Sequence, residues 1–195
     1  SDHNKHKSTN ADIYIDGAQK PSVMSRIRDT SLMFPERFRR AFVGNAGVIP
    51  FFEGMVITAK GETHNFPVGV EPEGGAQTRT GGLLRDNEAE GAQNLFSFDI
   101  NCFAPPDMPI DLVPEGRHHP DYLLRHNLYG IRDYGNRMGI PTVRAEFFFH
   151  PDFRGSVVSL GVAFGIMPEE RIDTPEPEVG DLVISIGGRT GRDGV

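Results

Sequence analysis

The sequence predicts an α/β domain of the α+β kind, in which a mixed sheet is flanked by helices. Short runs of alternating apolar residues recur along the chain and are typical of strands. One long amphipathic segment, residues 120–139, indicates a helix. Glycine- and proline-rich segments separate these runs and predict turns and loops. At 195 residues with 37% hydrophobic content, the chain is long enough to bury its own core.

The first half of the chain is predicted to alternate between strands and short helices. Strands are expected at residues 11–16 and 55–60, where apolar residues fall on one face. Helical character is expected at residues 22–29, 35–42 and 83–90, and Pro35 suits a first helical turn. Between the second strand and the last of these helices, residues 69–82 are rich in glycine and are predicted to form a loop.

The second half is predicted to contain the longest helix and most of the sheet. A polar, proline-rich loop at residues 107–119 leads into the helix, which Pro120 opens and Gly139 ends. Its apolar stripe is expected to comprise Leu124, Leu128, Ile131, Gly135 and Met138. Further strands are expected at residues 95–100, 142–149, 157–166 and 181–186, which makes about six strands in all.

Composition and charge narrow the classes of function. The formal net charge of -7 argues against a nucleic-acid partner, which would need a basic face. No apolar run approaches the roughly 20 residues that span a bilayer, so no membrane segment is expected. The single cysteine, Cys102, cannot form an internal disulfide, which indicates a reducing, cytoplasmic location.

The most informative stretch runs from Lys60 to Pro67, directly after a predicted strand. A carboxylate, a hydroxyl, an imidazole and an amide follow one another there, at the kind of strand end where α/β proteins bind ligands. Glu62 is a candidate ligand of Mg²⁺, which prefers one or two carboxylates together with water and phosphate oxygens. His64 is a candidate for proton transfer near neutral pH. The competing interpretation is a polar turn with an exposed histidine.

A second candidate site lies in the stretch from Gly74 to Asp86. Paired glycines allow backbone N–H groups to converge on an anion, and a following helix start favours negative charge. Arg85 is suited to a phosphate and Asp86 to a cation. The stretch is not a Walker loop, because no Gly-Lys-Ser/Thr follows, and a flexible connection is the alternative interpretation.

The N-terminal run Ser1–Lys7 carries two histidines, His3 and His6, beside lysines. With one distant cysteine and no second histidine pair at zinc-finger spacing, a zinc site is not expected. On composition alone the run is typical of a frayed polar terminus. The remaining histidines are expected to be solvated or structural, namely His118, His119, His126 and His150.

Taken in order, these stretches resemble phosphoribosylformylglycinamidine synthase, a family in the aminoimidazole ribonucleotide synthetase superfamily. The run from Glu62 to Asn65 is similar to the family signature, and Lys60 stands where the family has its preceding lysine. From Asp86 the chain is similar to a superfamily motif of Asp, four variable residues and Gly-Ala. The resemblance extends over nearly the whole chain, because the opening run and residues 10–21, 133–142 and 188–194 also fit.

The resemblance implies a role for each matching position. His3 and His64 would be catalytic, with His64 as proton acceptor, and Glu62 and Asp86 would bind Mg²⁺. His6 and Lys60 would contact ATP. The substrate formylglycinamide ribonucleotide would be bound at Thr63, His64, Asn65, Phe66 and Arg85. The implied reaction activates an amide oxygen with the γ-phosphoryl group of ATP and then displaces phosphate with ammonia, which a glutaminase supplies from glutamine.

The resemblance also implies a domain organisation. Residues 1–170 would form the N-terminal domain of the aminoimidazole ribonucleotide synthetase-like fold, and residues 171–195 the truncated start of a C-terminal half-domain. The sheet would pair with an equivalent domain, either a second synthetase half-domain or a homodimer mate. A glutaminase domain or subunit would be the further partner. Because both ends fall within glycine-rich or motif-like sequence, the chain is interpreted as a fragment that is inactive alone.

Four positions depart from the family pattern. Asn4 replaces a cysteine, Phe66 a second histidine, Asn94 a proline, and Arg144 the first glycine of a Gly-Gly-Glu run. Two alternatives therefore stay open beside the synthetase. One is another ATP-dependent member of the superfamily, such as aminoimidazole ribonucleotide synthetase or a thiamine-monophosphate or selenophosphate kinase-like protein. The other is a diverged, non-catalytic nucleotide-binding or assembly domain.

Overall fold

The computed structural model describes residues 11–172, 177–189 and 191, and its centre is a five-stranded sheet. The strand order is β3-β4-β7-β5-β6; β5 and β6 pair in parallel and all other neighbours are antiparallel. This arrangement confirms the predicted mixed sheet. The strands are β3 (Gly47–Pro50), β4 (Met55–Thr63), β5 (Gln93–Phe103), β6 (Thr142–Phe149) and β7 (Val158–Pro168).

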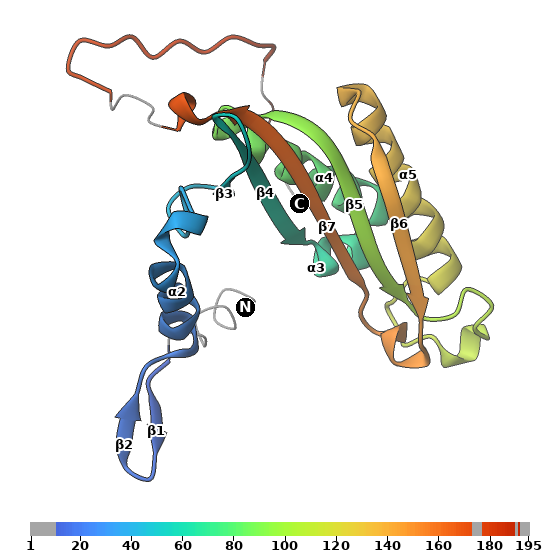
Figure 1. Cartoon of the computed structure of the whole chain (residues 1–195). Helices are drawn as coiled ribbons and strands as arrows, with labels where there is room; N and C mark the ends of the chain where they lie inside the picture. The colour runs from blue at the N-terminus through green and yellow to red at the C-terminus, as the bar shows by residue number, and fades with distance from the viewer. Residues whose placement is uncertain (1–10, 173–176, 190, 192–195) are drawn as a thin grey trace.

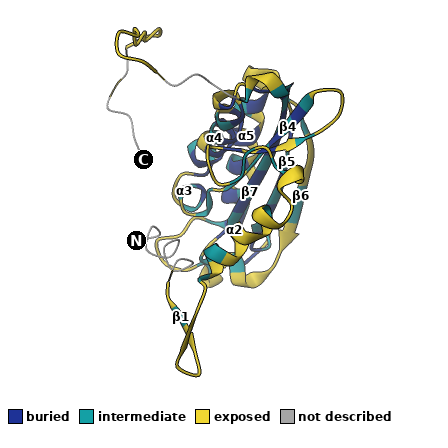
Figure 2. Ribbon diagram, turned by 60° about the vertical axis from the view of Figure 1, so that its left-hand side comes forward, coloured by how far each residue is buried: buried dark blue, intermediate teal, exposed yellow. Residues whose placement is uncertain are grey.

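Three helices cover one face of this sheet, as Figure 1 shows. They are α3 (Asn65–Val70), α4 (Pro72–Ala89) and α5 (Pro120–Met138). Figure 2 shows the buried residues concentrated between these helices and the sheet. The largest buried apolar cluster there comprises Val68, Ala76, Phe103, Leu123, Ile131 and Val157. Single 3-10 turns lie outside these layers, at η2 (Pro35–Arg37), η3 (Ile110–Leu112), η4 (Pro151–Arg154) and η5 (Glu169–Arg171).

The opposite face of the sheet is apolar and is not covered by the described part of the chain. Alternate residues of β7 turn their side chains to this face, because the intervening ones are buried under the helices. Aromatic rings from neighbouring strands meet on it: the Phe164 ring centroid lies 5.3 Å from that of Phe96 and 6.1 Å from that of Phe98. An apolar sheet face of this kind is expected to be buried against another layer.

The N-terminal elements extend beyond the β3 edge of the sheet (Figure 1). They are a hairpin of β1 (Ile13–Ile15) and β2 (Ala18–Lys20), followed by α2 (Val23–Met33), in which no residue is buried. The segment after α2 is fastened to the end of α4 through the buried Glu90 carboxylate. That carboxylate accepts hydrogen bonds from Arg40 Nη1 at 2.5 Å and from the Asn45 backbone N–H at 2.8 Å.

Two of the predicted elements are wrong. Residues 35–42 form only the turn η2, because Arg39 and Arg40 instead make backbone hydrogen bonds to Val48 of β3. Residues 181–186 form no strand in the described part of the chain, where Val183 is fully exposed and pairs with no neighbouring strand. The sequence also gave no sign of the short strands β2 and β3. The predicted strands at 55–60, 95–100, 142–149 and 157–166 are confirmed, three of them with longer bounds.

The largest correction concerns the glycine-rich passage at residues 69–82. It is not a loop but mainly the first half of the 18-residue helix α4, so no cradle of loop N–H groups exists there. The glycines instead mark places where other elements approach the helix closely. A Cβ atom at Gly75 would lie 2.6 Å from the Val68 backbone nitrogen, and one at Gly81 would lie 2.8 Å from the Tyr134 ring. Packing therefore outweighs the low helix propensity of glycine.

The long helix α5 is confirmed, and it ends at Gly139 with the positive φ of +70° that favours glycine there. Its predicted apolar stripe is partly wrong, because Leu128 and Met138 are exposed. The face that packs on α4 instead includes Gly130, where a Cβ atom would collide with the backbone oxygen of Glu73. No helix among the described residues is both long and apolar enough to cross a membrane.

Candidate active site

The candidate site lies along the C-terminal end of the strand β4 and the side of α4 that faces it. Lys60 and Glu62 are two residues apart in β4 and therefore extend from the same face of the sheet. The Lys60 ammonium forms an ion pair with Asp86 of α4, with 2.7 Å between Nζ and Oδ2. Both side chains are about one-quarter exposed, so this pair is partly open to solvent.

Glu62 packs directly on the backbone of α4 at Gly82. A Cβ atom at Gly82 would lie only 2.8 Å from Glu62 Oε2, so glycine makes room for this carboxylate. Gly82 and Asp86 are four residues apart on one side of α4, a separation of about 6 Å along the helix. The structure thus brings together the two carboxylates that the sequence proposed as metal ligands, with Lys60 beside them.

The carboxylates of Glu62 and Asp86 are suited to Mg²⁺ only if phosphate oxygens also coordinate the ion. Among the described residues, no group of three or more His, Cys, Asp or Glu side chains is placed to hold a metal ion. Mg²⁺ does not require such a group, because it commonly takes one or two carboxylates and completes its octahedron with water and phosphate oxygens. Glu62 and Asp86 fit that pattern, and Lys60 adds a positive charge suited to the same phosphates.

His64 occupies the junction between β4 and α3 in a fixed orientation. Its backbone N–H donates to the Ser159 carbonyl at 2.9 Å. Its ring Nδ1 lies 2.5 Å from the Gly75 carbonyl oxygen and 3.3 Å from Thr78 Oγ1. A carbonyl oxygen only accepts, so Nδ1 carries the ring proton and Nε2 of the neutral ring carries the lone pair. The geometry gives His64 the tautomer that a proton acceptor at Nε2 needs.

The neighbours of His64 line a cavity of about 530 Å³. Asn65 is held in place by its side-chain oxygen, which accepts from the Ser159 backbone N–H at 2.9 Å. Phe66 is 65% exposed and contributes an apolar wall at a position where the sequence resemblance implied a histidine. The cavity is lined by Thr63, His64, Asn65, Phe66, Pro67, Gly69, Arg117, His118, Leu123, Arg154, Gly155, Ser156 and Val157.

Arg85, the fifth predicted substrate contact, lies near the other end of α4. Its Nε donates to the Tyr134 hydroxyl at 2.9 Å, which ties α4 to α5. Ten residues of helix separate it from Gly75, the residue that His64 contacts, which corresponds to about 15 Å. Arg85 therefore lies at the Asp86 end of α4, on the side that faces α5, and does not line the cavity. The predicted residues His3 and His6 lie outside the described residues.

A buried polar network beneath the site was missed in the sequence. The Arg79 side chain is fully buried between α4 and the sheet, where it pairs with Asp99 of β5. Its Nη1 donates to Ser159 Oγ at 2.8 Å. Ser159 Oγ in turn donates to Asn127 Oδ1 at 3.0 Å. Ser159 also makes the two backbone contacts that hold His64 and Asn65, so the network supports both residues from below.

Burial dominates the electrostatics of the Arg79–Asp99 pair. Loss of hydration raises the pKa of the Asp99 carboxyl and lowers the pKa of the Arg79 guanidinium, although each charge attracts the other. Desolvation thus exceeds the attraction, as is common for buried ion pairs. The only sequence signal was the alternation of Ser97, Asp99 and Asn101 on the helix-facing side of β5, where apolar residues are expected.

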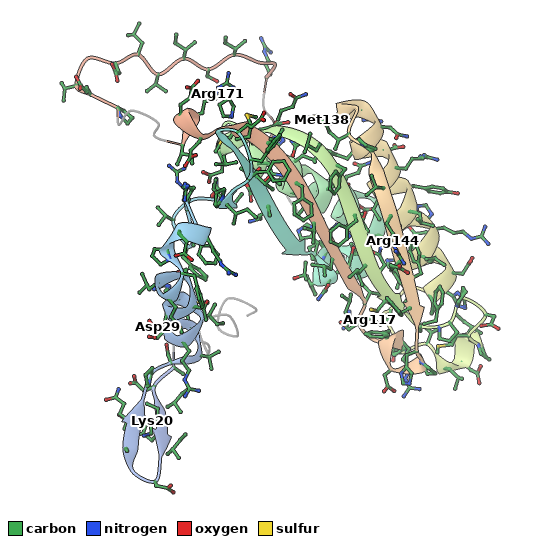
Figure 3. The ribbon with its side chains drawn as sticks, in the orientation of Figure 1. Lys20, Asp29, Arg117, Met138, Arg144 and Arg171 are labelled. Carbon is green, nitrogen blue, oxygen red and sulfur yellow. The ribbon has the colours of Figure 1, made fainter. Side chains whose placement is uncertain are left out.

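The departures Asn94 and Arg144 lie away from the cavity lining. Asn94 is buried and its side-chain nitrogen donates to the Leu84 carbonyl at 3.0 Å, so it fastens β5 to α4. Arg144 extends from β6 and pairs with Glu146; Figure 3 shows it midway along that strand. Arg144 therefore does not obstruct the site among the described residues.

Comparison with known proteins identifies the family of the chain. Residues 43–167 match the family described as AIR synthase related protein, N-terminal domain. The phosphoribosylformylglycinamidine synthase subunit PurL of Picrophilus torridus is 37% identical over 161 residues, covering 82% of this chain and 21% of the relative. The PurL subunit of Thermus thermophilus is 36% identical over 151 residues, covering 77% and 20%. The chain thus spans about a fifth of the length of these curated relatives.

Solved structures of other proteins have a fold similar to that of this chain. T. maritima PurL complexed with FGAR superimposes with a TM-score of 0.53 at 29% identity, over 72% of this chain and 21% of that one. AaThiL complexed with AMPPCP and TMP gives a TM-score of 0.52 at 9% identity over 74% and 42%, a likeness of fold alone. The chain therefore belongs to the AIR synthase related protein family and carries that family's N-terminal domain at residues 43–167.

Proposed function

We propose that this chain is part of an ATP-dependent carbon–nitrogen ligase that converts formylglycinamide ribonucleotide to formylglycinamidine ribonucleotide in purine biosynthesis. One observation carries the proposal. A group of one cation and two carboxylates lies beside a histidine of fixed orientation, and all of them lie between the strand β4 and the helix α4. Lys60, Glu62 and Asp86 form the cation-and-carboxylate group, and His64 follows Glu62 by two residues and lines the cavity. The PurL relatives and the T. maritima PurL complexes with FGAR and with ATP support it.

The proposed mechanism divides the work between the two ends of the site. Lys60 holds the phosphates of ATP, while Glu62 and Asp86 would hold Mg²⁺, which when bound would neutralise charge on those phosphates. The substrate amide lies between this group and the cavity, where its oxygen attacks the γ-phosphoryl group and ADP leaves. Ammonia then attacks the carbon of that amide. The bond from this carbon to the phosphorylated oxygen breaks and inorganic phosphate leaves, while His64 Nε2 accepts the proton that the ammonia nitrogen releases.

The remaining parts of the machinery are proposed to come from outside these residues. Glutamine would supply the ammonia through a glutaminase domain or subunit. A second synthetase half-domain or a homodimer mate would cover the apolar sheet face that includes Phe96, Phe98 and Phe164. Residues 1–170 and 171–195 are proposed as the N-terminal domain and the start of the next one. His3 and His6 are proposed to join the site as catalytic and ATP-contacting groups, and the protein is proposed to act in the cytoplasm.

The proposal predicts a specific dependence of ADP release. The protein that carries this chain, together with the other synthetase segments, is expected to form ADP from ATP only when formylglycinamide ribonucleotide, ammonia and Mg²⁺ are all present. A coupled assay of ADP measures this directly, with aminoimidazole precursors and thiamine monophosphate as control substrates. Absence of ADP with the proposed substrate overturns the assignment, and ADP with a control substrate instead favours another superfamily member. Replacing ammonia with glutamine then tests for the glutaminase.

Phe66 discriminates between an active enzyme and a diverged assembly domain. Its ring lines the cavity where relatives of this family carry a polar group, according to the sequence resemblance. If the protein is an active synthetase, restoring the histidine with Phe66→His is expected to change kcat/KM by less than about tenfold, the usual size of one hydrogen bond. A gain of several orders of magnitude over an inactive parent would instead support the assembly domain. Arg144→Gly is the matched control outside the cavity.

A further inference from the structure

We propose that Arg117 and Arg154 form the binding site for the phosphomonoester group of the substrate. This inference rests on the proposed function for the identity of the substrate, but the anion site itself rests on the cavity. Both arginines line the 530 Å³ cavity beside Thr63, His64, Asn65 and Phe66. They come from two separate segments, the loop before α5 and the turn η4 after β6. Figure 3 shows Arg117 at the end of the sheet where that turn lies.

The charge of the cavity is the first argument. The chain as a whole has a net charge of -7, with 27 acidic and 20 basic residues. The thirteen residues that line the cavity nevertheless include two arginines and two histidines and neither Asp nor Glu. A concave surface with only positive and neutral groups attracts anions, and its walls strengthen the attraction by excluding water.

The state of the two guanidinium groups is the second argument. Most arginines elsewhere in the domain are engaged with carboxylates, for example Arg40 with Glu90 and Arg79 with Asp99. Within the described ranges, no carboxylate lies in ion-pair distance of Arg117 or Arg154. Two unpaired guanidinium groups in the lining of one cavity offer the forked donors that bind a phosphate dianion through several hydrogen bonds.

The loop that carries Arg117 is anchored at the cavity. His118 Nε2 lies 2.9 Å from the Val70 carbonyl oxygen at the end of α3, and its ring packs at a tilt against Tyr122 with centroids 4.9 Å apart. His119 caps the start of α5, where its Nδ1 accepts from the Asp121 backbone N–H at 3.2 Å. The two residues that follow Arg117 are thus both fixed, which limits the positions that its own side chain reaches.

The layout of the whole site decides which phosphate belongs here. The Lys60–Asp86 pair and Glu62 lie at one end, near Arg85, and suit the polyphosphate of ATP with its metal ion. His64 lies between that end and the cavity. A ribonucleotide whose amide reacts near His64 must therefore direct its 5′-phosphate away from ATP, into the cavity. Arg85 lies about 15 Å along α4 from the residue that His64 contacts and is bonded to Tyr134, so it does not line this cavity.

The test compares kinetics for the two phosphorylated reactants in the protein that carries this chain with its synthetase segments. Arg117→Ala and Arg154→Ala are each expected to raise KM for formylglycinamide ribonucleotide by about 10- to 100-fold, the usual effect of losing a charged hydrogen bond. KM for ATP is expected to stay within about twofold. Arg132→Ala removes another exposed arginine, which lies over the Tyr129 ring outside the cavity, and it serves as the matched control.

A second arm uses the dephosphorylated substrate. The parent protein is expected to prefer the nucleotide over formylglycinamide riboside by a large factor in kcat/KM, and the double variant is expected to lose most of that preference. The inference is overturned if KM for ATP rises instead, or if neither KM changes. A third arm measures binding of ribose 5-phosphate by calorimetry. Weaker binding in both variants supports the anion site even if no ADP forms with the proposed substrate, whereas unchanged binding overturns the site independently of that activity.

Discussion

Replacing Asp99 with alanine is expected to lower the free energy of unfolding by about 3–5 kcal/mol, because it leaves the Arg79 guanidinium buried without a counter-charge. The guanidinium cannot escape to water, since its side chain is fully buried between α4 and the sheet. Urea unfolding of the chain, followed by far-UV circular dichroism, measures the change. A loss below about 1 kcal/mol would contradict the role assigned to the pair.

Two further variants separate charge burial from simple loss of packing. Arg79→Met combined with Asp99→Leu removes both charges at similar volume and is expected to recover most of the lost stability, because desolvation already exceeds attraction in the parent pair. The exposed pair of Arg125 and Asp121 on α5 is the matched control, and Asp121→Ala is expected to change stability little.

The same double variant also tests what the network does for the site. It removes the Arg79 donor from Ser159, whose backbone holds His64 and Asn65. A stable double variant with a normal KM for ATP but a lower kcat would identify Arg79 as a positioning residue. Full activity in that variant would limit the pair to a structural role.

The second large effect is expected at His64. His64→Asn keeps a side-chain N–H that reaches the Gly75 carbonyl but removes the lone pair of Nε2. The loss of a proton acceptor is expected to lower kcat of the full protein by about 10²- to 10⁴-fold. Both KM values and the unfolding free energy are expected to change little, because the local hydrogen bond is conserved. The rate of formylglycinamidine formation under saturating ammonia is the measurement.

His126 provides the matched control for this substitution. It is partly buried and pairs with Glu73 at 3.1 Å, yet it does not line the cavity. His126→Asn is therefore expected to leave kcat within about threefold of the parent value. If His64→Asn also stays within that range, His64 is not the proton acceptor and the proposed mechanism fails at that step.

Much of the fold follows from local patterns in the sequence. Alternation predicted four of the five strands of the sheet, and the proline and glycine that flank α5 gave its bounds almost to the residue. The strand that was not predicted, β3, is four residues long and ends in Pro50, so it is too short for an alternating pattern to indicate a strand. The helix at 35–42 failed because its residues pair with that strand, a contact that no local pattern records.

The candidate site was predicted in its chemistry but not in its layout. Lys60, Glu62 and His64 lie within five residues of one another in the sequence, so the sequence alone predicted that they lie close together. Asp86 was correctly associated with them, but through a loop that turned out to be a helix. The resemblance implied Arg85 as the phosphate contact; the cavity beside His64 is lined by Arg117 and Arg154, which no sequence motif marks and which we propose for that role.

The sequence by itself determined the fold class and the family, and it supplied the residues of the candidate site, because these depend on short-range periodicity and on a contiguous run, Glu62 to Asn65. Only the tertiary structure decided why α4 contains glycines, which residues surround the cavity, and how Arg79 is buried under Ser159. Each of these depends on elements far apart in the chain meeting at a few ångströms. Arg79 and Ser159, eighty residues apart, have no local pattern that records their contact.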